Sequence, residues 1–239
     1  MVLLALVLGH KHHIYHWLSP EGDKILEGKS GFLNATFFIV WTILAIGGWI
    51  GLGYKMRAIS KEIDDRDGLS VEEGKKYIWK NTVWAALFLV WFGLTVMSTV
   101  PWLWLMSLDA HWYSTMYSWY TFASTFVAGI SLIALFVVYL KNQGYLELVN
   151  HEHLHDLGKF MFAFSIFWTY LWFSQYMLIW YANIPEEVVY FKHRVQGPYR
   201  GIFFLNLIVN FVAPLLIMMR RSSKRNYTLI VFMASLIIC

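Results

Sequence analysis

Long apolar segments alternate with short polar ones along the chain. Each of five apolar segments has roughly the 20 residues that a helix needs to cross the hydrocarbon core of a bilayer. They contain no Asp, Glu, Arg or His, and Lys80 lies near an end, where its side chain can reach the membrane–water interface. Backbone amides cannot stay unpaired in lipid, so these segments are predicted to be helices. The pattern predicts an all-α, polytopic transmembrane bundle, a single membrane domain over residues 1–239, with full spans at about 32–54, 79–102, 117–140, 160–181 and 201–219.

Two shorter apolar runs lie at the ends of the chain, at 1–9 and 228–239. Both are too short to cross a bilayer, and the first lacks the basic region and cleavage site of a signal peptide. We interpret them as partial helices of a longer protein. The alternative is that both are short interfacial segments.

The composition agrees with a membrane protein and indicates its orientation. Apolar residues make up 58% of the chain and charged residues 14%, far from the balance of a soluble domain. Alternate loops carry unequal numbers of Lys and Arg: twelve in the segments 55–76, 141–159 and 220–225, and six in the others. The positive-inside rule places the first set in the cytoplasm. The formal charge of +4 is spread over these loops and forms no patch suited to nucleic acid.

Cysteine and histidine usage argues against a redox centre held by this chain. The single cysteine, Cys239, cannot form an internal disulfide, an iron–sulfur cluster or a covalent haem attachment. No histidine lies inside a predicted span, so we expect no haem between the helices. His10, His12, His13 and His16 cluster near the first run. The spacing from His12 to His16 could suit a metal, but without Cys or a suitably placed acid we expect interfacial hydrogen bonding and no metal site.

The outer loop 106–114 carries the most suggestive chemistry. Asp109 and His111 are two residues apart, the loop has no Lys or Arg, and aromatic residues surround it. Quinol oxidation needs an apolar slot for the ring, a hydrogen-bond acceptor at a hydroxyl group and a proton route to water. We therefore expect Asp109 to be partly buried and to act with His111 as an acid/base pair. Alternatively, Asp109 caps a helix and the aromatic residues form an ordinary interfacial belt.

Polar and small residues within the spans predict where helices meet. Gln175, Asn206 and Asn210 need hydrogen-bond partners in lipid, which another helix, a water chain or a quinone carbonyl could supply. The pair Gly47 and Gly51 forms a G-x-x-x-G motif. Ordinary helix packing is the alternative explanation for all of these patterns. In the third span, a buried face is predicted at Thr121, Ser124, Thr125 and Ala128. In the fourth span, a buried stripe is predicted at Ser165, Thr169, Trp172 and Gln175.

Two further helices are predicted outside the spans. Residues 145–157 place apolar side chains opposite acids and histidines, which predicts a short helix on the cytoplasmic face. Pro185 followed by Glu186 and Glu187 is typical of a helix start, because proline fits the first turn and carboxylates favour the positive end of the helix dipole.

The segments 155–160, 168–175 and 180–187 together resemble the quinone-binding membrane subunits of bacterial alternative complex III. This quinol:cytochrome c oxidoreductase has membrane subunits of the NrfD/PsrC-like superfamily. The stretches 9–17 and 106–114 match the same subunits. The likeness covers nearly the whole chain and is greatest to the second of the two homologous subunits, the ActF type.

The resemblance implies a location in the bacterial cytoplasmic membrane and a fold of about ten helices, of which this chain is an interior portion. It implies a multihaem cytochrome c subunit, an iron–sulfur subunit and a second NrfD-like subunit as partners, with haem and iron–sulfur centres held by those partners. Menaquinol is the implied substrate, oxidised at the periplasmic side. Asp109 and His111 are the implied catalytic residues. His10, His12, His13, His16, Gln175, Asn206 and Asn210 are candidates for a quinone site or a proton path.

Two other functions remain open at this stage. The chain could be a scaffold or a proton-conducting subunit of the same kind of complex, since its spans carry polar residues but no charge. It could also be a small-solute transporter, which predicts helices broken near the bilayer midplane. Only Pro214 and the pair Gly47-Gly48 favour a transporter.

Overall fold

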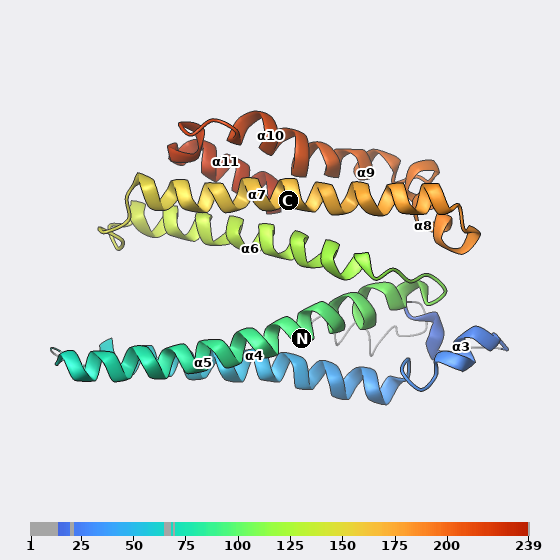
Figure 1. Ribbon diagram of the computed structural model, residues 1–239, viewed down its shortest axis with the longest axis horizontal. Coiled ribbons are helices and arrows are strands. Elements are labelled where there is room, and N and C mark those ends of the chain that lie inside the picture. Colours follow the sequence, from blue (N-terminus) through green and yellow to red (C-terminus); the bar gives the residue numbers. More distant parts are fainter. Residues whose placement is uncertain (1–13, 20–21, 65–67, 69, 239) are drawn as a thin grey trace. The chain divides into compact units, whose positions relative to one another are not determined.

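The computed structural model describes residues 14–19, 22–64, 68 and 70–238, and within these residues the chain is helical with no strand (Figure 1). The chain divides into two compact units, residues 1–111 and 112–239. The predicted partial helix at 1–9 lies outside the described residues, as do His10, His12 and His13.

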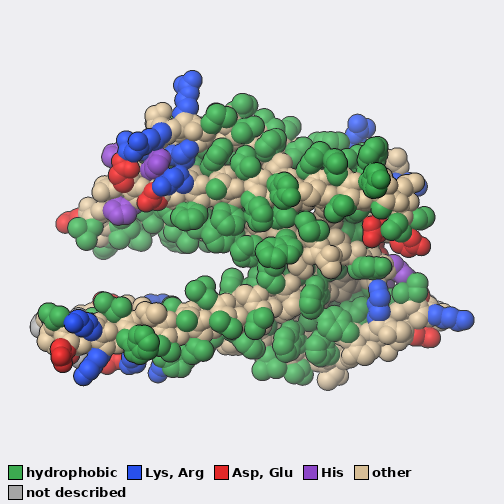
Figure 2. Space-filling model, in the orientation of Figure 1, with side chains coloured by type: hydrophobic (Ala, Val, Ile, Leu, Met, Phe, Trp, Pro, Cys, Tyr) green, Lys and Arg blue, Asp and Glu red, His purple; other side chains and the backbone are tan. Residues whose placement is uncertain are grey.

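Four segments are long and apolar enough to cross a membrane, by length and composition: Ala35–Asp64, Val71–Asp109, Met116–Asn142 and Arg200–Met218. They overlap four of the five predicted spans over most of their length. The fifth, 160–181, lies inside a helix of 32 residues rich in Trp and Tyr, and its membrane crossing stays a prediction. Hydrophobic side chains cover the lengths of the helices and charged ones gather near their ends (Figure 2), as lipid on the sides and water at the ends require.

Unit 1 is built on two long helices, α4 and α5, that pack against each other (Figure 1). A Ser70–Glu73 capping box starts α5, and at its other end the chain continues through a wide π-helical turn that contains the buried Pro101. Proline cannot donate the usual helical hydrogen bond, which explains a change of winding at this point. The elements of unit 1 are η1 (His16–Leu18), α3 (Lys24–Lys29), α4 (Ala35–Asp64), α5 (Val71–Ser98), η2 (Thr99–Leu105) and η3 (Met106–Asp109).

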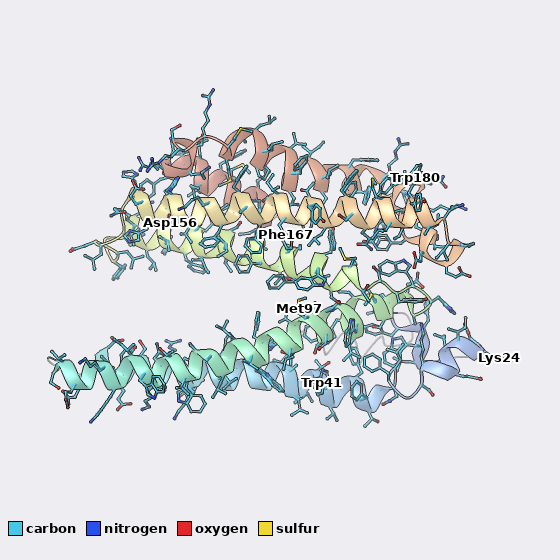
Figure 3. The ribbon with its side chains drawn as sticks, in the orientation of Figure 1. Lys24, Trp41, Met97, Asp156, Phe167 and Trp180 are labelled. Atoms are coloured by element: carbon cyan, nitrogen blue, oxygen red, sulfur yellow. The ribbon has the colours of Figure 1, made fainter. Side chains whose placement is uncertain are left out.

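Hydrogen bonds between indole and hydroxyl groups join α4 to the segment formed by α5 and η2. Trp41, labelled in Figure 3, donates from its indole N–H to the hydroxyl of Thr99 at 2.9 Å. Trp49 donates in the same way to Thr95 at 2.7 Å, and the indole of Trp104 donates to Thr42 at 3.1 Å. Each bond satisfies an N–H group that lipid could not.

The helix contact predicted at the G-x-x-x-G motif of Gly47 and Gly51 is wrong, because the close approach occurs at Gly48. A Cβ added at Gly47 or Gly51 would meet nothing within 4 Å, whereas one at Gly48 would lie 2.1 Å from the indole nitrogen of Trp91. Gly48 is therefore the residue that allows α4 and α5 to approach. The motif gives a spacing but not the rotation of the helix about its axis, which here turns Gly48 toward Trp91.

Unit 2 is centred on α6, which packs against both α7 and α11 (Figure 1). The predicted separate helix at 145–157 is wrong in its first half and in its end. Residues 145–150 are not helical, whereas 151–157 are the first turns of α7, which begins at His151 because the Asn150 side chain accepts hydrogen bonds from the amides of Glu152 and His153. The elements of unit 2 are α6 (Met116–Asn142), α7 (His151–Ala182), α8 (Pro185–Gln196), α9 (Arg200–Leu207), η4 (Ile208–Val212), α10 (Ala213–Met218), η5 (Ser223–Arg225) and α11 (Tyr227–Ile238).

Other predictions for unit 2 have mixed outcomes. Helix α8 begins at Pro185 and α11 covers residues 228–238 of the predicted terminal run, so both are confirmed as helices. The stripe on α7 is buried at Ser165 and Gln175, as predicted. The face predicted to be buried on α6 is correct at Thr121 but wrong at Ser124 and Thr125, which are exposed. Its buried residues are Ser118, Thr121, Ala123, Val127, Ser131, Ala134 and Val138.

Candidate functional site

A candidate site lies at one end of unit 1, where the short helix α3 meets the end of η3. The carboxylate of Asp23 starts α3 by accepting a hydrogen bond from the amide of Ile25 at 2.9 Å. At the other end of α3, the ammonium group of Lys29 donates to the carbonyl oxygen of Ala110 at 2.5 Å. Helix α3 therefore holds the chain at 110–111 from both of its ends. We call Asp23, Lys29, Asp109 and His111 the rim site.

His111 forms an imidazole–carboxylate pair with Asp23. Its Nε2 lies 2.9 Å from Asp23 Oδ2, while Oδ1 of the same carboxylate caps α3. The two side chains are 51% and 34% exposed, so water and a ligand can both reach the pair. With the Nε2 proton donated to Asp23, Nδ1 of the ring keeps a lone pair and can accept a proton. The pair has the chemistry of a general base.

Asp109 does not have the environment predicted for it. The side chain is exposed at the end of η3, and the structure shows no hydrogen bond or ion pair that joins it to His111. The partner of His111 is instead Asp23, 88 residues earlier in the sequence. Sequence reasoning missed Asp23 because its only local signal, an acid preceding a helix, is also that of an ordinary cap.

Aromatic side chains form a compact cluster beside the rim site. The rings of Tyr15, Trp17 and Phe38 lie 5.3–5.8 Å apart, and all three are buried. The Tyr15 hydroxyl donates to the carbonyl oxygen of Trp104 at 3.2 Å, and burial raises the pKa of this phenol while a hydrogen bond with Ser107 lowers it. The indole N–H of Trp17 is buried with no hydrogen-bond partner in the described part of the chain. His16, exposed between the two aromatic residues, belongs to the same end of the unit.

The aromatic residues predicted around Asp109 divide between the two units. Trp104 belongs to unit 1, whereas Trp112 begins unit 2. Within unit 2, the buried ring of Trp112 stacks on Tyr190 with ring centroids 4.4 Å apart. The Arg194 guanidinium lies 3.5 Å from the centroid of the same Tyr190 ring. Burial raises the pKa of Tyr190 to about 12, although Arg194 opposes the shift.

Gln175 is the most unusual polar residue of the apolar helices. It is 4% exposed on the buried face of α7, and its Nε2 has no hydrogen-bond partner in the residues that the structure covers. Ser165, on the same face and fully buried, has an unpartnered hydroxyl as well. Buried polar atoms without a protein partner commonly bind ordered water.

Asn210 is hydrogen-bonded to Asn206, one turn earlier. The Asn210 amide donates to the side-chain oxygen of Asn206 at 3.0 Å and to its carbonyl oxygen at 3.2 Å. Asn210 lies in the wide turn η4, four residues before Pro214. Since proline cannot donate to the carbonyl of residue 210, the wider turn accommodates it. The helix is widened here and not unwound, which offers no backbone site of the kind that transporters use.

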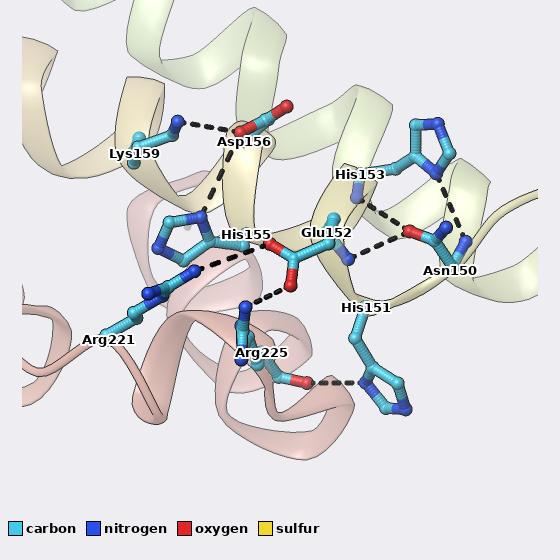
Figure 4. A network of polar contacts seen from close by, with 9 residues as sticks. All are labelled: Asn150, His151, Glu152, His153, His155, Asp156, Lys159, Arg221 and Arg225. Atoms are coloured by element: carbon cyan, nitrogen blue, oxygen red, sulfur yellow. Dashed lines mark hydrogen bonds and ion pairs between the residues drawn. The ribbon is translucent and has the colours of Figure 1, made fainter.

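A polar network surrounds the start of α7 at one end of unit 2 (Figure 4). Glu152 forms ion pairs with Arg225 and, at 3.9 Å, with Arg221. These contacts bring the two loops 141–159 and 220–225 to one end of the unit, consistent with their prediction as loops on the same side of the membrane. Asp156 pairs with Lys159 at 2.7 Å, and this contact lowers the pKa of the Asp156 carboxyl.

His155 in this network predicts a pH dependence of stability. Burial lowers its pKa from the usual 6.5, helped by the positive charges of Lys159, Arg221 and Arg225 and opposed by Glu152. The unfolded chain therefore binds a proton more readily than the folded one, and His155 reduces stability as the pH falls below 6.5. We expect His155→Gln to diminish the fall in unfolding temperature between pH 7.5 and 5.5. The exposed His193→Gln is the control, and equal falls in both variants would contradict the prediction.

No group of three or more His, Cys, Asp or Glu side chains in the described segments could hold a metal ion. His16 is the single member of the predicted histidine cluster whose position the structure gives. No protein-family model and no curated protein sequence matches this chain.

Proposed function

We propose that this chain is a membrane subunit of a quinol:cytochrome c oxidoreductase of the bacterial cytoplasmic membrane, and that quinol is oxidised at the rim site. The observation that carries the proposal is the His111–Asp23 pair, 2.9 Å apart and half exposed at one end of unit 1. The four apolar helices supply the membrane setting, and the resemblance in sequence supplies the reaction. We also propose the five-span count and the larger ten-helix fold that this resemblance implies.

The rim site supplies the proton chemistry of the reaction. Oxidation of a quinol to a quinone releases two protons and two electrons. The Nδ1 atom of His111 takes the first proton from a quinol hydroxyl, while Asp23 holds the imidazole ring in position. The second proton passes to water or to the exposed carboxylate of Asp109. The two electrons would pass to redox centres held by partner subunits, a multihaem cytochrome c and an iron–sulfur protein.

The aromatic cluster beside the rim site supports binding of a quinol ring. The rings of Tyr15 and Trp17 form the apolar wall of this end of the unit, and the buried indole N–H of Trp17, which has no acceptor among the described residues, could donate to a quinone oxygen. Ligand sites typically combine an apolar lining with a few polar groups in fixed positions.

Photolabelling with an azidoquinone tests quinone binding directly. The assembled complex is irradiated, and the labelled peptides are mapped by mass spectrometry. We expect label on residues 14–34 or 103–111, suppressed by excess unlabelled quinol. Label found only on residues 112–239, or label that quinol does not suppress, would contradict the proposed site.

A second function, proton conduction, is favoured by the unpartnered polar atoms of Gln175 and Ser165. They lie ten residues apart on one face of α7, about 15 Å along the helix axis, and bound water between them would form part of a proton path. We expect Gln175→Leu to preserve quinol-dependent electron transfer and to lower the number of protons moved per electron. The control is Gln143→Leu, at the exposed end of α6. An unchanged ratio for Gln175→Leu would exclude the path.

A further inference from the structure

A depression in the surface of unit 2 lies where η5 gives way to α11. Its volume is about 760 Å³ and it is open to solvent. It adjoins the end of Arg200–Met218, a segment long and apolar enough to cross a membrane, and so belongs at the level of lipid headgroups. It is lined by His151, Arg221, Ser222, Arg225, Asn226, Tyr227 and Thr228.

The charges around the depression are mainly positive. Arg221 and Arg225 line it, and one carboxylate, that of Glu152, is shared between both guanidinium groups (Figure 4). The neighbouring Lys224 does not line the depression, and its ammonium group donates to the carbonyl oxygens of Met218 and Met219. Two guanidinium groups and one carboxylate leave a net positive charge for an anion.

Two hydrogen-bond donors of the lining residues have no acceptor. The Nε–H of Arg225 and the hydroxyl of Tyr227 are buried and have no partner among the residues described. The Arg225 guanidinium group donates from Nη2 to Glu152, and its Nε–H is the donor that has no acceptor. An unpaired buried donor is unfavourable, and a bound acceptor would remove that cost. Arginine presents its donors in a geometry that matches phosphate oxygens.

The start of α11 adds a third feature that favours an anion. The side chain of Asn226 accepts from the amide of Thr228 at 2.9 Å and fixes the first turn beside the depression. The positive end of the helix dipole is therefore directed at the lining residues. The Tyr227 ring makes two contacts, with the ring of His151 at 5.0 Å between centroids and with the ammonium group of Lys141 at 5.7 Å from its own centroid.

We propose that this depression binds an anionic phosphate group, with Arg221, the free donor of Arg225 and the hydroxyl of Tyr227 as its ligands. The phosphate can be that of an anionic lipid headgroup or free inorganic phosphate, which share this chemistry. The position at the end of an apolar segment favours the lipid. The site is independent of quinol oxidation, because it belongs to unit 2 alone.

Binding to the purified full chain in neutral detergent micelles tests the proposal. The probes are dioleoylphosphatidylglycerol, dioleoylphosphatidylcholine and inorganic phosphate, and bound lipid is counted by native mass spectrometry. We expect phosphatidylglycerol to bind at least tenfold more tightly than phosphatidylcholine. Tyr227→Phe should weaken phosphatidylglycerol binding by at least about tenfold, the effect of one hydrogen bond to a charged group, and Arg221→Gln should weaken it more.

Controls separate loss of the site from loss of the fold. Tyr227→Phe keeps both ring contacts and removes an unpaired hydroxyl, so the ligand-free unfolding temperature should not fall. Arg220→Gln, next to Arg221 but outside the lining, should bind like the wild type. Inorganic phosphate that binds with the same variant dependence would support the site and identify free phosphate as its source. Equal binding by wild type and both lining variants would overturn the proposal.

Discussion

Replacing His111 with Gln lowers quinol-dependent cytochrome c reduction by at least about 100-fold, if the imidazole is the base that accepts the quinol proton. Glutamine keeps a polar side chain of similar size but cannot take up a proton. The pair with Asp23 is half exposed, so the substitution should leave unit 1 folded. The measurement is the steady-state rate in membranes that contain the assembled complex, with the amount of complex fixed by its haem absorbance.

Two further variants distinguish the roles within the rim site. Asp23→Asn should reduce the rate by a smaller factor, because asparagine still caps α3 but no longer pairs with His111 as a charged group. Asp109→Asn tests the predicted acid, and an unchanged rate would remove Asp109 from the proton route. His193→Gln in the exposed part of α8 is the control for loss of any histidine. Full activity of His111→Gln would refute the proposed mechanism.

Gly48→Ala destabilises unit 1 by about 1–3 kcal/mol, the usual cost of forcing extra volume into a packed interface. The new methyl group would lie 2.1 Å from the Trp91 indole nitrogen and 2.6 Å from its Cε2. The indole must then move, and its hydrogen bond to the carbonyl oxygen of Ala45, 3.4 Å long, is lost. The measurement is the free energy of unfolding of the full chain in detergent micelles, from a reversible denaturant titration.

The matched control is Gly51→Ala, three residues further along the same helix. A Cβ at Gly51 meets nothing within 4 Å, so this substitution should leave stability unchanged or raise it slightly through better helix propensity. Equal effects of the two substitutions would show that Gly48 does not set the approach of α4 and α5. The comparison also tests the G-x-x-x-G motif directly, since the motif singles out Gly51 and the structure singles out Gly48.

The predictable part of the fold is the part that lipid dictates. The span predicted at 117–140 agrees within two residues with the bounds of α6, because a long uncharged segment in a bilayer can pair its backbone groups only as a helix. Helix α4 runs ten residues past the predicted end at 54, since Lys, Arg, Ala and Glu continue a helix readily in water. Hydropathy therefore predicts where a helix leaves the lipid, but it does not predict where the helix itself ends.

Contacts between distant residues were the part that the sequence could not reveal. His111 was identified from its loop, but its partner Asp23 lies beyond two long helices, and nothing local connects them. The burial of Gln175 was predictable because it shares a helical stripe with other small or polar residues. The side of α6 that faces its neighbours was not, because small residues occur on more than one face of that helix.

The indole–hydroxyl bonds of unit 1 have a mechanical consequence. Trp41 and Trp49 are two turns apart on α4, and their acceptors Thr99 and Thr95 follow in the opposite order, as antiparallel helices require. Sliding one helix along the other by a single turn would break both bonds at once, in surroundings that offer no water to replace them. The two helices are thereby locked in axial register, and their ends are kept at a constant depth in the bilayer.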